Sequence, residues 1–128
     1  MIVIQELRIG NYFYHSNDEI HKVCSIIEDG VNYDIDFQSI YMYDENKYEN
    51  INPIPLNEEW LLKLGLLDIG NNKYRFNNFV IEFQNNMFIL KFIAITGQLI
   101  NLSKEIKYVH SLQNIVFALT NTELTIKE

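Results

Sequence analysis

Cysteine is almost absent from this sequence of 128 residues, in which Cys24 is the single thiol. One thiol cannot form an internal disulfide, so the fold does not depend on an oxidising compartment. The sequence also lacks the cysteine pairs of a zinc site, and its three histidines, His15, His21 and His110, are isolated from one another. We therefore expect no metal ion, and we interpret Cys24 as a small buried apolar residue.

Glycine and proline are scarce as well, with five and two residues. The glycines form neither a Gly-x-Gly-x-x-Gly run nor a Gly-Lys-Ser/Thr run, which excludes the common phosphate-binding loops. Asp44-Glu45-Asn46 resembles the start of a calcium loop. However, Glu49 stands at the sixth position instead of glycine, and Pro55 stands at the twelfth instead of a bidentate acid. No cofactor is expected.

Long hydrophobic runs are also missing. The stretch Phe88 to Ile95 is interrupted by Lys91, and it is far shorter than the roughly 20 residues that a membrane-spanning helix needs. The opening MIVIQELRIG has no basic segment before its apolar residues, so it predicts a first strand rather than a signal peptide. We therefore expect no membrane association and a cytoplasmic location.

What the sequence has in quantity is apolar and acidic residues. Hydrophobic residues make up 48% of the chain, with eight phenylalanines, eight tyrosines and one tryptophan, which is enough for a packed core. Residues 1–56 contain ten acidic side chains against three basic ones and so carry the whole net charge of −7, whereas residues 57–128 contain seven of each. An acidic half disfavours direct nucleic-acid binding and favours a protein partner with a basic surface.

The hydrophobic pattern predicts a single α+β domain over 1–128, with a β-rich acidic part at 1–56 followed by helix, meander and helix at 57–128. In the first part, Asp29-Gly30 predicts a hairpin between two alternating segments. Pro53 and Pro55 favour an edge strand or a connector. The short strands expected there, at 9–14, 19–27, 31–37 and 40–43, favour a small SH3-like β-barrel or a sheet.

The second part begins with a predicted helix near 58–64, which Asn57 caps and Gly65 closes. Asparagine pairs and Thr96-Gly97 then separate apolar segments, which predicts a four-stranded antiparallel meander over 72–102. A final helix over 104–119, capped by Ser103, follows from apolar residues at helical spacing. Its expected buried stripe comprises Tyr108, Val109, Leu112, Ile115, Val116 and Leu119, and Trp60 is expected to join the core.

Four acidic residues are the first candidate partner-binding group. Asp34 and Asp36 share the predicted solvent face of one strand, and Asp44 and Glu45 lie in the polar loop that follows. Together they predict a negative patch that docks on a basic protein, or alternatively a surface that only keeps the chain soluble. Paired carboxylates also perform acid–base catalysis, but no substrate pocket is predicted beside them.

The last predicted helix carries the second candidate group. Ile106, His110, Gln113 and Phe117 form a stripe beside the buried one. This stripe is either the rim of the core or a contact surface on which His110 and Phe117 meet a partner, since aromatic residues dominate interface hot spots.

Three segments carry a resemblance to known proteins: LRIGNYFYHSNDEIHKV, INPIPLNEEWLLKLG and IKYVHSLQNIVFALTNTELTI. Together they resemble a group of short uncharacterised proteins of phages and mobile elements of Bacteroidota, over nearly the whole chain. The resemblance implies a bacterial host, and no catalytic residues can be carried over from the group. Small acidic proteins in that setting act as inhibitors of host enzymes, including CRISPR effectors, which is an association and not a physical argument.

The leading hypothesis from the sequence is thus a non-enzymatic accessory protein that binds and inhibits a host protein. Its partner would be a nucleic-acid-handling defence enzyme, such as a nuclease or a ribonucleoprotein, with a basic surface. The alternative hypothesis is a structural or adaptor component of a phage or mobile element that acts through self-assembly or partner assembly. The third hypothesis is an enzyme whose catalytic residues are not recognised in the sequence.

Overall fold

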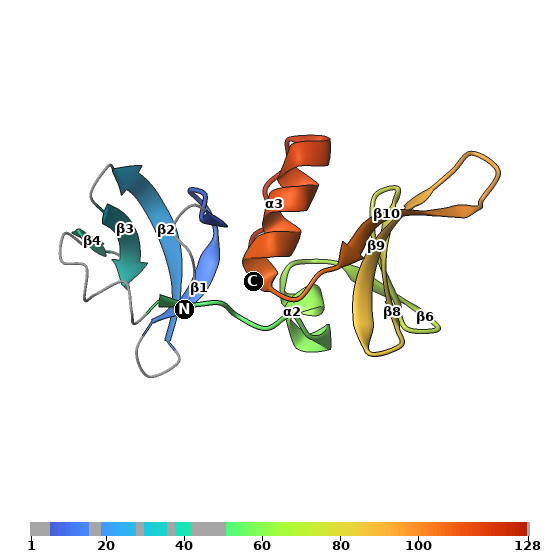
Figure 1. The fold of residues 1–128 in the computed structure, drawn as a ribbon, viewed down its shortest axis with the longest axis horizontal. Helices are drawn as coiled ribbons and strands as arrows, with labels where there is room; N and C mark the ends of the chain where they lie inside the picture. The colour runs from blue at the N-terminus through green and yellow to red at the C-terminus, as the bar shows by residue number, and fades with distance from the viewer. Residues whose placement is uncertain (1–5, 16–18, 28–29, 36–37, 42–50, 128) are drawn as a thin grey trace. The chain divides into compact units, whose positions relative to one another are not determined.

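A computed structural model describes residues 6–15, 19–27, 30–35, 38–41 and 51–127, with backbone only for the strands between 25 and 41. The chain divides into two compact units. Met1–Pro55 and Tyr108–Glu123 form the first unit, and Leu56–Lys107 and Leu124–Glu128 form the second. Each unit contains one antiparallel five-stranded sheet, so the α+β class is confirmed (Figure 1). The single-domain organisation stays a prediction.

The sheet of the first unit has the strand order β4-β3-β2-β1-β5. Its described strands form an open sheet that ends in β4 and β5, not a closed barrel, and the SH3-like likeness stays a prediction. Every pair of neighbours is antiparallel. The strands are β1 (Tyr12–His15), β2 (Glu19–Ile27), β3 (Gly30–Ile35), β4 (Gln38–Tyr41) and β5 (Ile51–Asn52).

Strand β2 turns one face inward in its first half. His21 and Val23 are buried, whereas Ile20 and Lys22 are exposed. Cys24 is only half-buried, which corrects its interpretation as a buried core residue. The sulfur Sγ of Cys24 lies 3.7 Å from the carbonyl oxygen of Lys22.

Helix α3 (Val109–Thr120) belongs to the first unit and packs against β1. The predicted core positions Val109, Leu112 and Val116 are buried as expected, but Leu119 is 49% exposed. The sequence pattern instead predicts this helix in one part with the meander, over 57–128. The helix ends at Asn121, which adopts a left-handed backbone conformation and donates its N–H to the Phe117 carbonyl.

The predicted start of this last helix is wrong. Residues 104 and 105 belong to a strand, and the helix begins at Val109 without a side-chain cap. Ser103, the expected cap, accepts a hydrogen bond from the backbone N–H of Leu90 at 3.0 Å and donates to the Lys104 carbonyl. Its hydroxyl therefore joins two strands, because strand pairing competes successfully with the local capping preference.

The second unit consists of helix α2 and a meander of five strands in sequential order. The sequence predicted four strands, and β6 is the one it missed. All four residues of β6 are exposed, so this edge strand has no apolar alternation to reveal it. The elements are α2 (Glu58–Lys63), β6 (Leu67–Gly70), β7 (Lys73–Phe76), β8 (Phe79–Gln84), β9 (Met87–Ile93) and β10 (Leu99–Glu105).

Asparagine pairs make two of the hairpin turns in this meander. Asn71-Asn72 and Asn85-Asn86 all have positive φ angles, between 55° and 60° in the first pair and between 52° and 62° in the second. Positive φ at both central residues is the requirement of the two-residue type I′ turn, which asparagine tolerates better than most residues. These turns fix the register of the flanking strands. The sequence predicted the hairpin at Asn85-Asn86, but not the one at Asn71-Asn72, because it missed β6.

Helix α2 also forms as predicted. The side chain of Asn57 accepts a hydrogen bond from the Trp60 N–H at 2.9 Å, and Gly65 follows the helix with a positive φ of 90°. Trp60 is buried, as predicted. The sheet contributes Tyr74, Ile81 and Leu90 to the core of this unit, and these three lie opposite one another in register. Among the described residues, neither α2 nor α3 is long and apolar enough to cross a membrane.

Candidate partner-binding site

The acidic patch predicted from the sequence lies largely beyond the described residues. Asp34 is in β3, at the register position opposite Lys22 of β2 and Ser39 of β4. Asp36, Asp44 and Glu45 lie outside the described residues. The negative patch therefore stays a prediction.

His110 and Phe117, the other predicted partner-binding residues, belong to the internal packing of the first unit to different degrees. The His110 side chain is 2% exposed and stacks on Tyr108, with ring centroids 5.7 Å apart and planes 9° apart. Phe117 is half-buried beneath the Arg8 guanidinium, which lies 4.1 Å from the ring centroid. Ile106 is buried but precedes the helix. His110 thus fits the core-rim interpretation of the stripe.

The electrostatic environment of His110 is unusual for a buried histidine. Its Nε2 lies 3.4 Å from a Glu6 carboxylate oxygen, and its Nδ1 has no hydrogen-bond partner among the described residues. Burial lowers the pKa of His110, and the hydrogen bond and charge of Glu6 oppose this shift only in part. The ring is therefore held in its neutral form near pH 7.

A polar network joins α3 to the chain before β1. Gln113 is fully buried; its amide oxygen accepts from the Tyr12 N–H at 2.9 Å, and its amide nitrogen donates to the Gly10 carbonyl at 2.9 Å. Asn114 accepts from the side chains of Arg8 at 3.1 Å and Asn11 at 2.8 Å. These bonds connect residues about one hundred positions apart, so we assign the network a structural role in the first unit.

The histidines are less isolated than the sequence suggested. His15 in β1 and His21 in β2 have ring centroids 5.6 Å apart, and the Nε2 of His21 lies 3.5 Å from a Glu19 carboxylate oxygen. Burial and the neighbouring His21 lower the pKa of His15, whereas Glu19 raises it. In the part of the chain that the structure describes, no group of three histidine, cysteine, aspartate or glutamate side chains is placed to hold a metal ion.

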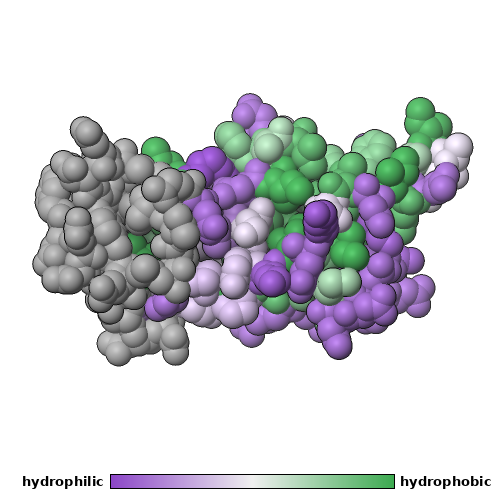
Figure 2. All heavy atoms as spheres, viewed as in Figure 1, coloured by the Kyte–Doolittle hydropathy of each residue, from purple (hydrophilic) through white to green (hydrophobic). Residues whose placement is uncertain are grey.

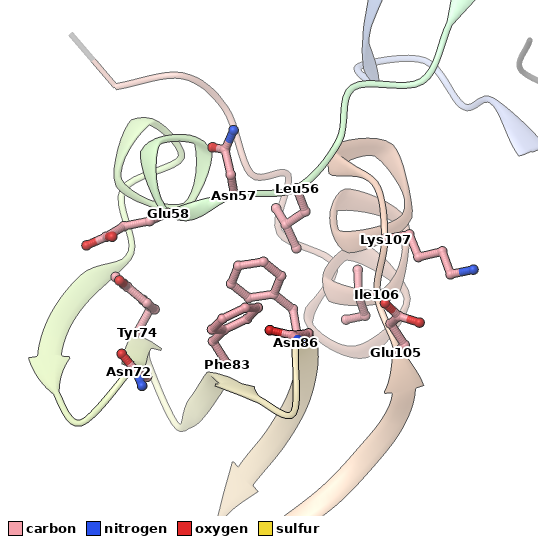
Figure 3. A pocket seen from close by; sticks show the side chains of 11 residues that line it. Leu56, Asn57, Glu58, Asn72, Tyr74, Phe83, Asn86, Glu105, Ile106 and Lys107 are labelled. Atoms are coloured by element: carbon pink, nitrogen blue, oxygen red, sulfur yellow. The ribbon is translucent and has the colours of Figure 1, made fainter.

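The second unit contains a cavity that sequence reasoning missed. Its volume is about 450 Å³, within the range of binding pockets for small ligands or side chains. The start of α2, the strands β7 to β9 with two of their turns, and the segment at the end of β10 surround it (Figure 3). It is lined by Leu56, Asn57, Glu58, Asn72, Tyr74, Phe83, Asn86, Phe88, Glu105, Ile106 and Lys107.

Aromatic rings form one wall of this cavity. Phe83 and Phe88 are paired across the β8–β9 hairpin, with ring centroids 4.7 Å apart and planes tilted by 41°. Phe83 remains 36% exposed. The signal for this pair was present in the sequence, because a two-residue turn at Asn85-Asn86 places the residues two before and two after it opposite each other.

Two carboxylates and one ammonium group belong to the cavity lining. In Figure 3 the Glu58 carboxylate lies beside the Tyr74 hydroxyl, and the Lys107 side chain extends away from the cavity. Burial, the hydrogen bond to Glu58 and the charges of Glu58 and Asp68 together raise the pKa of Tyr74 to about 12. The hydroxyl therefore stays protonated, and the potential around it is negative.

Exposed apolar side chains lie on both edge strands of the second sheet. On β6, Leu67 is 68% exposed and Ile69 is 49% exposed; on β10, Ile100 and Leu102 are also exposed. Ile95 projects fully into solvent from the β9–β10 turn. In Figure 2, apolar side chains reach the surface around β9 and β10 and at the tip of the hairpin that joins them.

Comparison of this chain with protein-family models, with curated proteins and with solved structures gave no match.

Proposed function

We propose that this protein is a non-enzymatic accessory protein of a phage or mobile element, and that it binds and inhibits a host protein in the bacterial cytoplasm. The observation that carries the proposal is the exposure of apolar side chains on both edge strands of the second sheet. Apolar side chains exposed next to one another, as Leu67 and Ile69 are along β6, favour a protein-interaction site, because their burial against a partner removes them from water.

The edge strand β6 is suited to partner binding in a second way. Its backbone pairs with β7 on one side only, and Leu67 and Ile69 are the exposed apolar residues along it. An extended segment of a partner can add to such an edge through main-chain hydrogen bonds, while the side chains supply specificity.

The charge distribution favours a basic partner. Residues 1–56 carry the whole net charge of −7, which would steer a positively charged protein into contact and raise the association rate. Nuclease and ribonucleoprotein surfaces that hold nucleic acid are basic. A nucleic-acid-handling defence enzyme, such as a CRISPR effector, is the partner class that we propose from this charge and from the sequence resemblance.

The proposal is tested by capture followed by an activity assay. The tagged protein would be used to isolate its partner from a Bacteroidota lysate, and the purified partner would then be assayed for nucleic-acid cleavage with and without one equivalent of this protein. We expect the activity to fall. A partner whose activity does not change on complex formation would contradict the inhibitor role.

A pair of variants tests the site. Leu67→Lys with Ile69→Lys places two charges on the edge strand, whereas Leu62→Lys places one on α2, at a position about as exposed as Ile69. We expect the β6 variant to bind the partner at least tenfold more weakly, because hot-spot positions contribute about 2 kcal/mol or more to binding. Leu62→Lys should bind like the wild type.

A structural or adaptor role is the second candidate function, and β6 favours it specifically. An exposed apolar edge can pair with the same edge of a second copy and so drive self-assembly. Sedimentation velocity over a range of concentrations decides between the two functions. Self-association that Leu67→Lys abolishes would support the assembly role, whereas a monomer at all concentrations would exclude assembly through this edge.

A further inference from the structure

We propose that the cavity of the second unit binds an arginine side chain of the basic partner protein. This inference rests on the proposed function, since it names the chemistry by which that partner is recognised. It assigns a role to cavity-lining residues that solvent can reach, among them Phe83, Glu58 and Glu105.

The aromatic wall is the first argument for a cationic guest. The faces of phenylalanine rings carry negative partial charge and attract cations that come within about 6 Å of the ring centroid. Phe83 and Phe88 present two such rings side by side, and both line the cavity. The first unit of the same chain contains this interaction in the stacking of Arg8 on Phe117 at 4.1 Å.

The sign of the charge around the cavity is the second argument. Glu58 and Glu105 belong to the lining, and the cation among the lining residues, Lys107, points away from the cavity. Burial is the main cause of the raised pKa of Tyr74, and the negative charges of Glu58 and Asp68 add to it. A cation entering the cavity would be attracted, whereas a phosphate or carboxylate would be repelled.

Hydrogen-bond acceptors favour arginine over lysine. Guanidinium is planar, stacks on aromatic rings and presents five N–H donors in a fixed arrangement. In Figure 3 the Asn86 side chain lies beside the rings, and Asn72 and Glu105 contribute further potential acceptors from other parts of the lining. The volume of about 450 Å³ accommodates the side chain together with part of the backbone that carries it.

A peptide titration tests the inference with no need for the natural partner. Acetyl-Gly-Arg-Gly-amide would be titrated into the ¹⁵N-labelled full chain, and the amide chemical shifts would be followed. The matched probe is acetyl-Gly-citrulline-Gly-amide, which replaces the guanidinium by a neutral urea of the same shape. We expect saturable shifts at Tyr74, Phe83 and Phe88 with the arginine peptide, and binding of the citrulline peptide at least threefold weaker.

Two glutamates in the same helical turn provide the matched variants. Glu58→Gln and Glu59→Gln each remove one negative charge from α2, but Glu58 lines the cavity and Glu59 pairs with Lys63 instead. We expect Glu58→Gln to weaken binding of the arginine peptide about two- to fivefold and Glu59→Gln to leave that affinity unchanged. Phe83→Leu, which keeps an apolar side chain but removes one ring, should weaken binding about two- to thirtyfold.

Several outcomes would overturn the inference. Equal binding of the arginine and citrulline peptides, shifts confined to residues away from the cavity, or tighter binding of acetyl-Gly-Glu-Gly-amide would each do so. If the partner is captured and inhibited while the arginine peptide does not bind, this inference alone fails. If the peptide binds the cavity but the captured partner is not inhibited, the proposed function alone fails.

Discussion

The side-chain carbonyl oxygen of Gln113 accepts a hydrogen bond from the backbone N–H of Tyr12 at 2.9 Å. This contact connects the middle of α3 to the first residue of β1, and both residues are buried. A buried backbone donor at the end of a strand costs free energy when it has no acceptor. Gln113 supplies that acceptor from a distant part of the chain.

Substitution of Gln113 should therefore destabilise the protein strongly. Gln113→Met keeps the length of the side chain but removes its hydrogen bonds with the Tyr12 N–H and the Gly10 carbonyl. We expect the free energy of unfolding to fall by about 2–6 kcal/mol, since losing a buried hydrogen-bond partner costs about 1–3 kcal/mol and two such bonds are lost. Urea denaturation measures this change. The exposed Gln98→Met serves as the control and should change stability by less than about 0.5 kcal/mol.

Two leucines of α3 should respond differently to truncation. Leu112 is fully buried and Leu119 is 49% exposed. We expect Leu112→Ala to lower the free energy of unfolding by about 2–5 kcal/mol, because a cavity remains in the core. Leu119→Ala should cost less than about 1 kcal/mol. Similar losses for both variants in denaturant melts would show that the buried face of α3 is assigned incorrectly.

Stability should fall at acidic pH through His110. Burial lowers the pKa of His110 in the folded state below its ordinary value of 6.5. The unfolded chain therefore binds a proton more readily, so the stability linked to this histidine is present above about pH 6.5 and is lost as the pH falls toward the folded-state pKa.

The pH dependence is checked with a variant that cannot titrate. His110→Gln should lose less free energy of unfolding than the wild type between about pH 7.5 and about pH 5, because this linkage is removed. Chemical denaturation at several pH values measures both curves, and other titrating groups cancel in their difference. A difference that stays constant over the pH range would contradict the prediction.

The acidic half should govern the rate of partner association. Replacing Asp34, Asp36, Asp44 and Glu45 by their amides removes four negative charges with little change in side-chain size. We expect a slower on-rate that depends less on salt, because steering by charge is screened at high ionic strength. The thermal midpoint should stay nearly unchanged. Stopped-flow mixing with the purified partner at two salt concentrations is the measurement.

The competing interpretation of the four acids makes a different prediction. If they only keep the surface solvated, the amide variant becomes less soluble but binds the partner with unchanged affinity and salt dependence. That result would exclude docking through the acidic patch and would leave the edge strand β6 as the partner contact.

Elements determined by short-range interactions could be predicted from the sequence. The Asn85-Asn86 turn carries its own left-handed backbone preference, so the hairpin between β8 and β9 follows from two residues. Asn57 caps α2 through a bond to Trp60, three positions away. The predicted buried stripe of α3 is confirmed at Val109, Leu112 and Val116, which recur at helical spacing.

Long-range interactions decided the rest. The Ser103 hydroxyl has the same capping preference as Asn57, but it lies within reach of the Leu90 N–H and becomes part of the sheet. Gln113 is polar and yet fully buried, because its acceptors and donors lie about one hundred residues away. The cavity likewise requires three segments that only the fold of the second unit brings together. A local pattern records what a residue prefers, whereas the tertiary structure determines which partner satisfies that preference.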